Sequence, residues 1–150
     1  MSSSADAIFV RGASTGERVL LVAHRAAARE ESARYRGEPW TPSDEVAPEE
    51  SVILVAGVGE TVMASLEAAR EDESGRWWIR HVHVEEHARE VGLGDALMLA
   101  LASEVARRGG TWIGASAQPG DRSLKNLYER HGLVARTILV GRSVDPRPSE

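Results

Sequence analysis

Along the first 50 residues, a strand-like pattern of apolar positions is followed by a helix-like one. The run AIFVRGA at residues 7–13 predicts a short strand. Residues 18–34, RVLLVAHRAAAREESAR, predict a helix because they are rich in helix formers and their apolar or small positions recur at helical spacing. Residues 37–50 hold three prolines and a cluster of acids, which is typical of a loop. A strand, a helix and a loop are therefore expected in this order.

The middle of the chain has the pattern of an antiparallel meander. Residues 51–70 form two strand-like runs that break near residues 57–60, and the turn EDESG leads into a third run, RWWIRHVHV, at residues 76–84. Residues 87–90, HARE, predict a loop. A helix that ends at RRGG is then predicted by apolar residues at steps of four: Leu93, Leu97, Leu101 and Val105.

Length and composition narrow the class of protein. A chain of 150 residues matches a single domain, here residues 1–150, that is long enough to bury a core. The absence of cysteine excludes a disulfide framework, a thiolate metal site and a cysteine nucleophile. The start MSSSADAIFV has neither a basic region nor a long apolar stretch, and no later run is long enough to span a bilayer. We therefore expect a soluble, cytoplasmic protein without a membrane partner.

The net charge of -5 argues against a nucleic-acid partner, because affinity for phosphate backbones needs a basic surface. The charge is unevenly distributed. Residues 1–75 hold 14 acids and 7 bases, whereas residues 76–150 hold 9 acids and 11 bases. An anionic ligand is expected to prefer the second half.

The histidines near residue 83 raise the question of a metal site. His83, Glu86 and His87 spell H-x-x-E-H, the order in which some zinc peptidases carry two ligands and a general base. That motif works on a helix, whereas the residues before His83 favour a strand, in which the two histidines would lie about 13 Å apart. His24 and His131 come without a motif that would supply a third ligand. No metal is expected.

The start of the helix near residue 92 suits an anion. Gly92 and Gly94 let backbone N–H groups approach a phosphate closely, and the helix dipole adds about 0.3 to 1 kcal/mol in the same sense. The dinucleotide fingerprint does not fit, because Leu97 stands where a third small residue is wanted. Two interpretations stay open: a phosphate of another ligand, or a tightly packed helix start.

Two motifs, one after the other along the chain, favour the first interpretation, in which the helix start binds a phosphate. Residues 89–94 make R-x-x-G-x-G directly after a strand that ends at residues 82–84, and residues 128–132 make Y-E-x-x-G. With these motifs, residues 52–140 resemble the GNAT family of N-acetyltransferases. The N-terminal strand and helix fit by their order only.

The resemblance implies an α/β fold of the α+β kind. Its central sheet is mixed and mostly antiparallel, has about six to seven strands and is flanked by about four helices. The sheet splays open between its fourth strand, here residues 76–84, and its fifth, here TWIGASA at residues 111–117. Acetyl-CoA lies in that opening, where its pantetheine arm pairs with the fourth strand like an added strand.

The same resemblance implies which residues touch acetyl-CoA. The pantetheine arm follows the end of the fourth strand, and the pyrophosphate rests on the amides of residues 89–95. Relatives often carry Asn where Asp121 stands in this chain. The implied cofactor contacts are Val82, His83, Val84, Arg89, Glu90, Val91, Gly92, Leu93, Gly94, Asp95, Asp121, Asn126 and Tyr128.

The implied chemistry is direct attack of a neutral amine on the thioester carbonyl. Backbone N–H on the fourth strand can stabilise the carbonyl oxygen, and a phenol can protonate the departing sulfur. Tyr128 is the expected acid, although the apolar stripe that it shares with Leu124 and Leu127 also allows a role in packing alone.

The general base is less defined by the resemblance. Trp78 and Arg80 occupy the positions where several relatives carry Glu or His, and neither can act as a base at neutral pH. His81, His83 and Glu85 are nearby substitutes, and His83 comes first because its ordinary pKa of about 6.5 suits the task. The simplest other interpretation of His81 and His83 is a pair of half-exposed strand residues.

The expected function is transfer of an acetyl group from acetyl-CoA to a primary amine of a small molecule or peptide. The acceptor would be shaped by residues 33–50, by residues 70–75 and by C-terminal strands, with an aromatic lining from Trp40, Trp77 and Trp78 unless Trp78 belongs to the core. The acidic balance of this region favours a cationic amine, although solvation explains the acids equally well. The alternative function is a sensor or scaffold that binds acyl-CoA without turnover, and a homodimer is compatible with either.

Overall fold

The computed structural model describes residues 7–35, 50–142 and 144–146. The chain order is β1 (Ile8–Gly12), the 3-10 turn η2 (Thr15–Glu17), α1 (Arg18–Ser32), β2 (Ser51–Val58), β3 (Thr61–Arg70), β4 (Arg76–Val84), the 3-10 turn η4 (Glu86–Ala88), α2 (Leu93–Arg107), β5 (Trp112–Gly114) and α3 (Arg122–Arg130). The predicted strand, helix, three-stranded meander and second helix are confirmed. None of the helices in these described ranges is long and apolar enough to cross a membrane.

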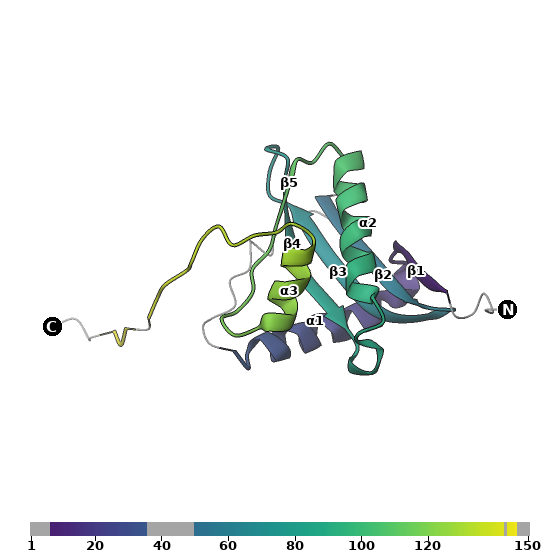
Figure 1. Cartoon of the computed structure of the whole chain (residues 1–150), viewed down its shortest axis with the longest axis horizontal. Coiled ribbons are helices and arrows are strands. Elements are labelled where there is room, and N and C mark those ends of the chain that lie inside the picture. Colours follow the sequence, from purple (N-terminus) through teal and green to yellow (C-terminus); the bar gives the residue numbers. More distant parts are fainter. Residues whose placement is uncertain (1–6, 36–49, 143, 147–150) are drawn as a thin grey trace.

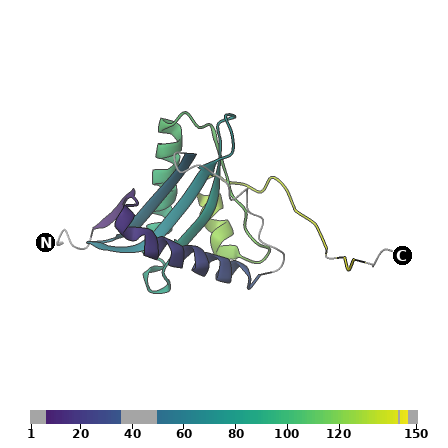
Figure 2. The same ribbon diagram turned by 180° about the vertical axis from the view of Figure 1, so that it is seen from behind.

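One mixed sheet has the strands in the order β1-β2-β3-β4-β5. The first four strands are antiparallel neighbours, and β5 runs parallel to β4. Helices α2 and α3 lie on one face of the sheet (Figure 1), and α1 crosses the other face (Figure 2). The expected mixed, mostly antiparallel fold is therefore confirmed.

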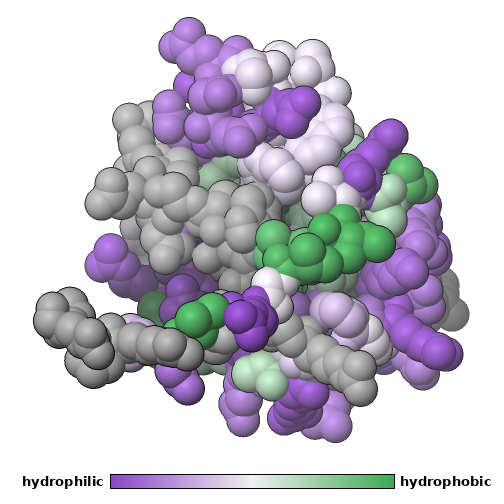
Figure 3. All heavy atoms as spheres, turned by 90° about the vertical axis from the view of Figure 1, so that its left-hand side faces the viewer, coloured by the Kyte–Doolittle hydropathy of each residue, from purple (hydrophilic) through white to green (hydrophobic). Residues whose placement is uncertain are grey.

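The numbers of strands and helices differ from the expectation. The described ranges contain five strands and three α-helices rather than six to seven strands and about four helices. The additional strands were expected from the resemblance to the GNAT family, and no alternation of apolar and polar residues predicted them. In the structure, residues 133–142 form no strand and carry four exposed apolar side chains: Val134, Ile138, Leu139 and Val140. Figure 3 shows hydrophobic residues gathered in a patch on one face of the molecule.

The two faces of the sheet carry different chemistry because side chains alternate along each strand. On the α2 side, β3 contributes Leu66 to an apolar core that includes Leu97 and Leu101 from the helix. On the α1 side, the neighbouring positions Ser65 and Glu67 are buried and polar. A polar layer therefore lies between α1 and the sheet.

A β-bulge in β4 decides which residues meet this polar layer. Glu67 pairs with His81, whereas Ala68 pairs with Ile79, so Arg80 is an additional residue in β4. Because of the bulge, apolar residues of β4 face α2 both before and after Arg80, and His81 and His83 face α1. The residues on the core side of β4 are Trp77, Ile79, Val82 and Val84.

The sheet opens between β4 and β5. The two strands pair only over Arg76–Trp78 and Trp112–Gly114. At the last pair the indoles of Trp78 and Trp112 meet edge to face with centroids 4.9 Å apart. Only glycine fits at position 114, since a Cβ there would overlap the Trp112 ring and lie 2.9 Å from that of Trp78. Beyond this point the outer edge of β4 has no strand partner in the described part of the chain.

The turn between β2 and β3 yields a test of the fold. A Cβ at Gly57 would overlap the carbonyl oxygen of Thr61 and lie 2.7 Å from its carbonyl carbon, at the position where the β2–β3 register shifts. We expect Gly57→Ala to lower the free energy of unfolding by about 1 to 3 kcal/mol, because backbone atoms must move. Gly12→Ala is the control, since a Cβ there meets nothing within 4 Å. Urea denaturation of both variants with equal losses would contradict this account.

Candidate active site

A single cleft of about 1320 Å³ occupies the opening beside β4. Its walls come from β4, the start of α2, α3 and one side of α1. It brings together all the residues expected to touch acetyl-CoA except Val91, whose side chain is half exposed and does not line the cleft. The contact expected of Val91 was through its backbone amide and stays a prediction.

The segment before α2 turns sharply at two left-handed residues. Gly92, the N-cap of α2, has φ 90°, and Glu90 has φ 70°, which is uncommon for a residue with a side chain. The first backbone bond within the helix runs from Ala96 N to Gly92 O, so the N–H groups of residues 92–95 have no partner within the helix. A bare helix start therefore faces the cleft, where a Cβ at position 92 would point into open space.

The acid at the start of α2 is neutralised by α3. Asp95 accepts bonds from Arg130 Nε at 3.1 Å and lies 2.7 Å from His131 Nε2. The Arg130 guanidinium, with His131, holds the pKa of Asp95 below its ordinary value. Asp95 thus ties α2 to α3, and its charge does little to repel an anion at this helix start.

Arg89 connects the cleft to α1. Its Nε donates to the Val84 carbonyl at 3.1 Å, and its guanidinium pairs with Glu31 near the end of α1. No sequence pattern indicated Glu31, because the contact joins residues 58 positions apart.

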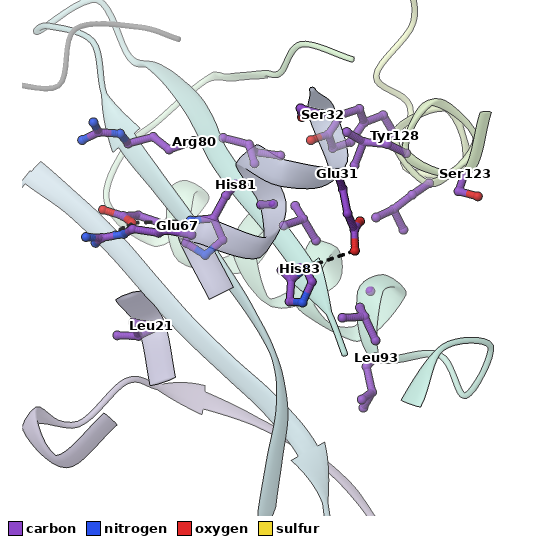
Figure 4. A pocket seen from close by; sticks show the side chains of 18 of the residues that line it. Leu21, Glu31, Ser32, Glu67, Arg80, His81, His83, Leu93, Ser123 and Tyr128 are labelled. Atoms are coloured by element: carbon purple, nitrogen blue, oxygen red, sulfur yellow. Dashed lines mark hydrogen bonds and ion pairs between the residues drawn. The ribbon is translucent and has the colours of Figure 1, made fainter. Parts of the chain in front are cut away.

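His83 and His81 are buried, with 8% exposure each, and the interpretation of both as half-exposed residues is wrong. The reason is that α1 covers their face of the sheet. The Nδ1 atom of His83 lies 3.9 Å from Glu31 Oε1, and its ring centroid is 4.8 Å from that of His24. Figure 4 shows Glu31 pointing from α1 toward His83. Burial lowers the pKa of His83, Glu31 opposes this, and Arg89 adds to it.

A chain of buried polar groups continues from His83 beneath α1. Ser65 Oγ lies 2.7 Å from His24 Nδ1 and 3.2 Å from His81 Nε2. Glu67 accepts a bond of 2.7 Å from Arg25 Nε and lies 3.5 Å from His81. Burial lowers the pKa of His81 to about 3, so this imidazole is neutral at physiological pH. His81 is therefore poorly suited to act as the general base.

The position of Tyr128 is compatible with both roles expected for it. Its side chain belongs to the core cluster and also lines the cleft. In Figure 4 it reaches from α3 toward Glu31 and Ser32 at the end of α1. Burial, with the charge of Asp121 adding to it, raises the pKa of Tyr128, so the phenol keeps its proton at neutral pH.

The other candidates in α3 have separate tasks. Asp121 is the N-cap of α3, and its carboxylate accepts a bond from Leu124 N at 3.2 Å. Asp121 and Asn126 both line the cleft. The cap gives Asp121 a structural role that the Asn of relatives could fill equally well.

The described residues do not form the aromatic lining expected for the acceptor. Trp77 is 2% exposed and belongs to the core, and Trp78 packs against Trp112; neither lines the cleft. Trp40 lies outside the described residues. The zinc motif is divided between a strand and a short turn, with His83 in β4 and His87 in η4. Within the described ranges no three His, Asp or Glu side chains are arranged to hold a metal ion.

The sequence profile of the Acetyltransferase (GNAT) family matches residues 21–133. The chain belongs to this family. It is thereby an acyltransferase that depends on acetyl-CoA, as the two motifs indicated. A search of curated protein sequences gave no significant match.

Solved structures share the GNAT fold at low sequence identity. A predicted acetyltransferase from Clostridium acetobutylicum, solved with acetyl-CoA, is 16% identical with a TM-score of 0.68, covering 91% of this chain and 96% of its own. An aminoglycoside acetyltransferase from an uncultured soil metagenomic sample, solved with sisomicin, is 10% identical with a TM-score of 0.65, covering 93% and 97%. A transcriptional regulator from Bacillus halodurans is 20% identical with a TM-score of 0.68, covering 92% and 100%.

The buried imidazole of His81 predicts a pH dependence of stability. Its pKa is about 3 in the folded chain and about 6.5 when unfolded, so its contribution is present above pH 6.5 and is lost as pH falls toward 3. Between pH 7.5 and 5 we expect a loss of about 2 kcal/mol from this residue. His81→Gln should lose less over this range, whereas His87→Gln, at an exposed position, should keep the native dependence. Urea denaturation at both pH values measures this, and equal pH dependence in both variants would refute it.

Proposed function

We propose that this GNAT domain transfers the acetyl group of acetyl-CoA to a primary amine by direct attack, with Tyr128 as the general acid and His83 as the general base. The observation that carries the proposal is the cleft itself. It joins the unpaired edge of β4, the bare start of α2 and the Tyr128 side chain in one continuous space. The strand edge suits the pantetheine arm of acetyl-CoA, the helix start suits its phosphates, and Tyr128 suits its leaving sulfur.

The residues of the cleft fit acetyl-CoA. The free N–H groups of residues 92–95 and the positive end of α2 suit the pyrophosphate. The open space beside Gly92 leaves room for a phosphate against the backbone. The peptide groups of Val82, His83 and Val84 lie on a strand edge that a pantetheine amide can extend.

Acetyl-CoA supplies an activated acetyl thioester. The β4 edge orients its carbonyl and offers a backbone N–H where charge develops on the oxygen. Tyr128 is protonated at neutral pH and buried in the cleft, so its O–H can donate to the departing sulfur.

His83 is suited to accept the proton that the amine loses. Its lowered pKa leaves it neutral at neutral pH, and it lines the cleft. Glu31 lies near its Nδ1 and can stabilise the imidazolium that forms. The two roles thus fall to side chains on different elements, with α1 supporting the base and α3 carrying the acid.

A second candidate function is an acyl-CoA sensor or scaffold. Trp78 and Arg80 occupy the family's usual base positions, and a protein of the same fold is described as a transcriptional regulator. The two functions are separated by CoA release from acetyl-CoA in the presence of a panel of amines. Release that depends on the amine supports catalysis, whereas tight CoA binding with no release for any amine supports the sensor.

The start of α2 yields a matched pair of variants for cofactor binding. A Cβ at Gly94 would lie 3.4 Å from Leu127, an ordinary contact, so Gly94→Ala should bind CoA nearly as the native protein does. Gly94→Glu places a longer, negative side chain between α2 and α3 and should abolish binding. The measurement is the rise in melting temperature with CoA, which reflects binding to the native state. If Gly94→Glu keeps the native shift, the helix start is not the phosphate site.

Tyr128→Phe separates acid catalysis from packing. The ring is kept and a single O–H is lost, so kcat should fall by about 10² to 10⁴ with CoA affinity nearly unchanged. If Tyr128 only packs, kcat should stay near native while stability changes by about 1 kcal/mol. Steady-state kinetics and melting temperature on the same variant decide between them.

A further inference from the structure

Two contacts between a histidine and a glutamate join α1 to the end of β4. The Nε2 atom of His24 lies 3.8 Å from Glu85 Oε2, and the Nδ1 atom of His83 lies 3.9 Å from Glu31 Oε1. In each contact one partner belongs to α1 and the other to β4 or to the residue directly after it. We call these two contacts the crossed pairs.

The spacing of the four residues explains why they meet. His24 and Glu31 are seven positions apart, which is close to two full helical turns, so both project from the same side of α1. His83 and Glu85 are two positions apart and share one face of the extended chain. The strand pairing continues to Glu85, whose N–H donates to the Met63 carbonyl at 2.9 Å. One side of the helix therefore meets one face of the strand at two points.

The ring of His24 packs against that of His83 in the interior. The two ring centroids are 4.8 Å apart, the planes are tilted by 59°, and His24 is 3% exposed. The buried Ser65 places its Oγ 2.7 Å from His24 Nδ1. Ser65 at one edge and Glu85 at the other thus hold the ring on which His83 rests.

The packing of α1 alone does not favour a histidine at position 24. Its Nε2 atom is buried and has no hydrogen-bond partner among the described residues. A buried nitrogen without a partner lowers stability, and an apolar side chain beside the buried Leu21 would avoid this loss. The histidine is better explained by its contact with His83.

The charges around the two rings favour a proton on His83 rather than on His24. Burial, and then the charge of a protonated His83, lower the pKa of His24, whereas Glu85 opposes this. His24 therefore stays neutral when His83 becomes an imidazolium. The other charged or titratable neighbours of His83 are Glu31, Arg89, Glu85 and the neutral His81.

We propose that His24 and Glu31 are positioning residues for His83, which hold its neutral ring with the proton on Nδ1 and leave Nε2 free to take a proton from the acceptor amine. The inference rests on the proposed acetyl transfer, in which His83 is the base. His24 does not line the cleft, so it acts through His83.

The position of the proton follows from the carboxylate beside Nδ1. A neutral imidazole carries one proton, and the surroundings of its two nitrogens decide which of them holds it. At 3.9 Å Glu31 is too far for a hydrogen bond, but its charge still favours a proton on Nδ1. When the amine attacks, Nε2 gains the amine proton and Nδ1 keeps its own, so the imidazolium forms next to Glu31.

The direct test is the tautomer of His83, measured by ¹⁵N NMR of the imidazole rings at mildly alkaline pH in the protein without ligand. His83→Gln assigns the signal, since its spectrum lacks that ring. We expect the native ring to carry its proton on Nδ1. His24→Leu removes both polar edges of the supporting ring, and Glu31→Gln removes the charge. Both should move the population toward the Nε2–H form, which free histidine prefers in water.

The same variants have an expected effect on turnover. CoA release from acetyl-CoA is followed with the fastest acceptor among spermidine, tyramine and glycinamide. His24→Leu should lower kcat by about 10- to 100-fold, because a base held in the wrong orientation is seldom ready to react. The rise in melting temperature with CoA should stay near native, because His24 does not line the cleft.

Two control variants separate positioning from stability and from charge alone. Val55 is fully buried and lies opposite Ser65 in the sheet, so Val55→Ala loosens the same layer without contact to the cleft. Glu30 is exposed and adjacent to Glu31, so Glu30→Gln removes one neighbouring charge. Both should keep the native tautomer of His83, with kcat within about twofold of native.

Three results would overturn the inference while acetyl transfer stands: a native His83 with its proton on Nε2, a His24→Leu protein with the native tautomer and rate, or equal effects of His24→Leu and Val55→Ala. A different result bears on the proposed function. If His83→Gln keeps the native rate, His83 is not the base, and the role of His24 falls with it. The NMR measurement needs no acceptor, so it decides the tautomer whichever amine is the substrate.

Discussion

The site depends on the point at which β4 and β5 stop pairing. Trp78, Trp112 and Gly114 pack so closely there that the two strands are held together over three positions, and then β5 ends. Backbone N–H and C=O groups need partners, and among the described residues no other strand pairs with the outer edge of β4 beyond Trp78. The bulge at Arg80 lies within this stretch and directs Val82 and Val84 into the core, which fixes the edge in place. In the proposed function, the sites of the cofactor arm, the phosphates and the acid all lie around this opening.

The polar layer under α1 gives that helix a role beyond covering the sheet. Buried ionisable groups cost stability unless they are bonded, and here Arg25 bonds Glu67 while Ser65 lies between two imidazoles. The same helix brings Glu31 to His83 and to Arg89. The chemistry of the cleft is thus set by α1 as much as by the two motifs, although α1 carries neither.

The sequence predicted what depends on local order and missed what depends on distant contacts. Strand and helix limits followed from periodicity, and the glycines at 92 and 94 followed from the needs of a helix start. The burial of His81 and His83 could not be predicted, because alternation shows which residues share a face but not what covers that face. The inserted Arg80 shifts the alternation within β4, so Trp77 falls in the core and Trp78 beside β5 rather than in the cleft. Glu31 and Glu67 reach the site through contacts that no spacing indicates.

The unpaired edge of β4 has a consequence for how the protein behaves in solution. A strand edge with free peptide groups is a template on which a strand of another chain can add, and natural sheets commonly cover or interrupt such edges. In this sheet the bulge at Arg80 and the Arg89 guanidinium on the Val84 carbonyl interrupt the edge only in part. A ligand that extends β4 would cover the remainder, so the occupancy of the cleft and the resistance of the chain to aggregation are physically linked.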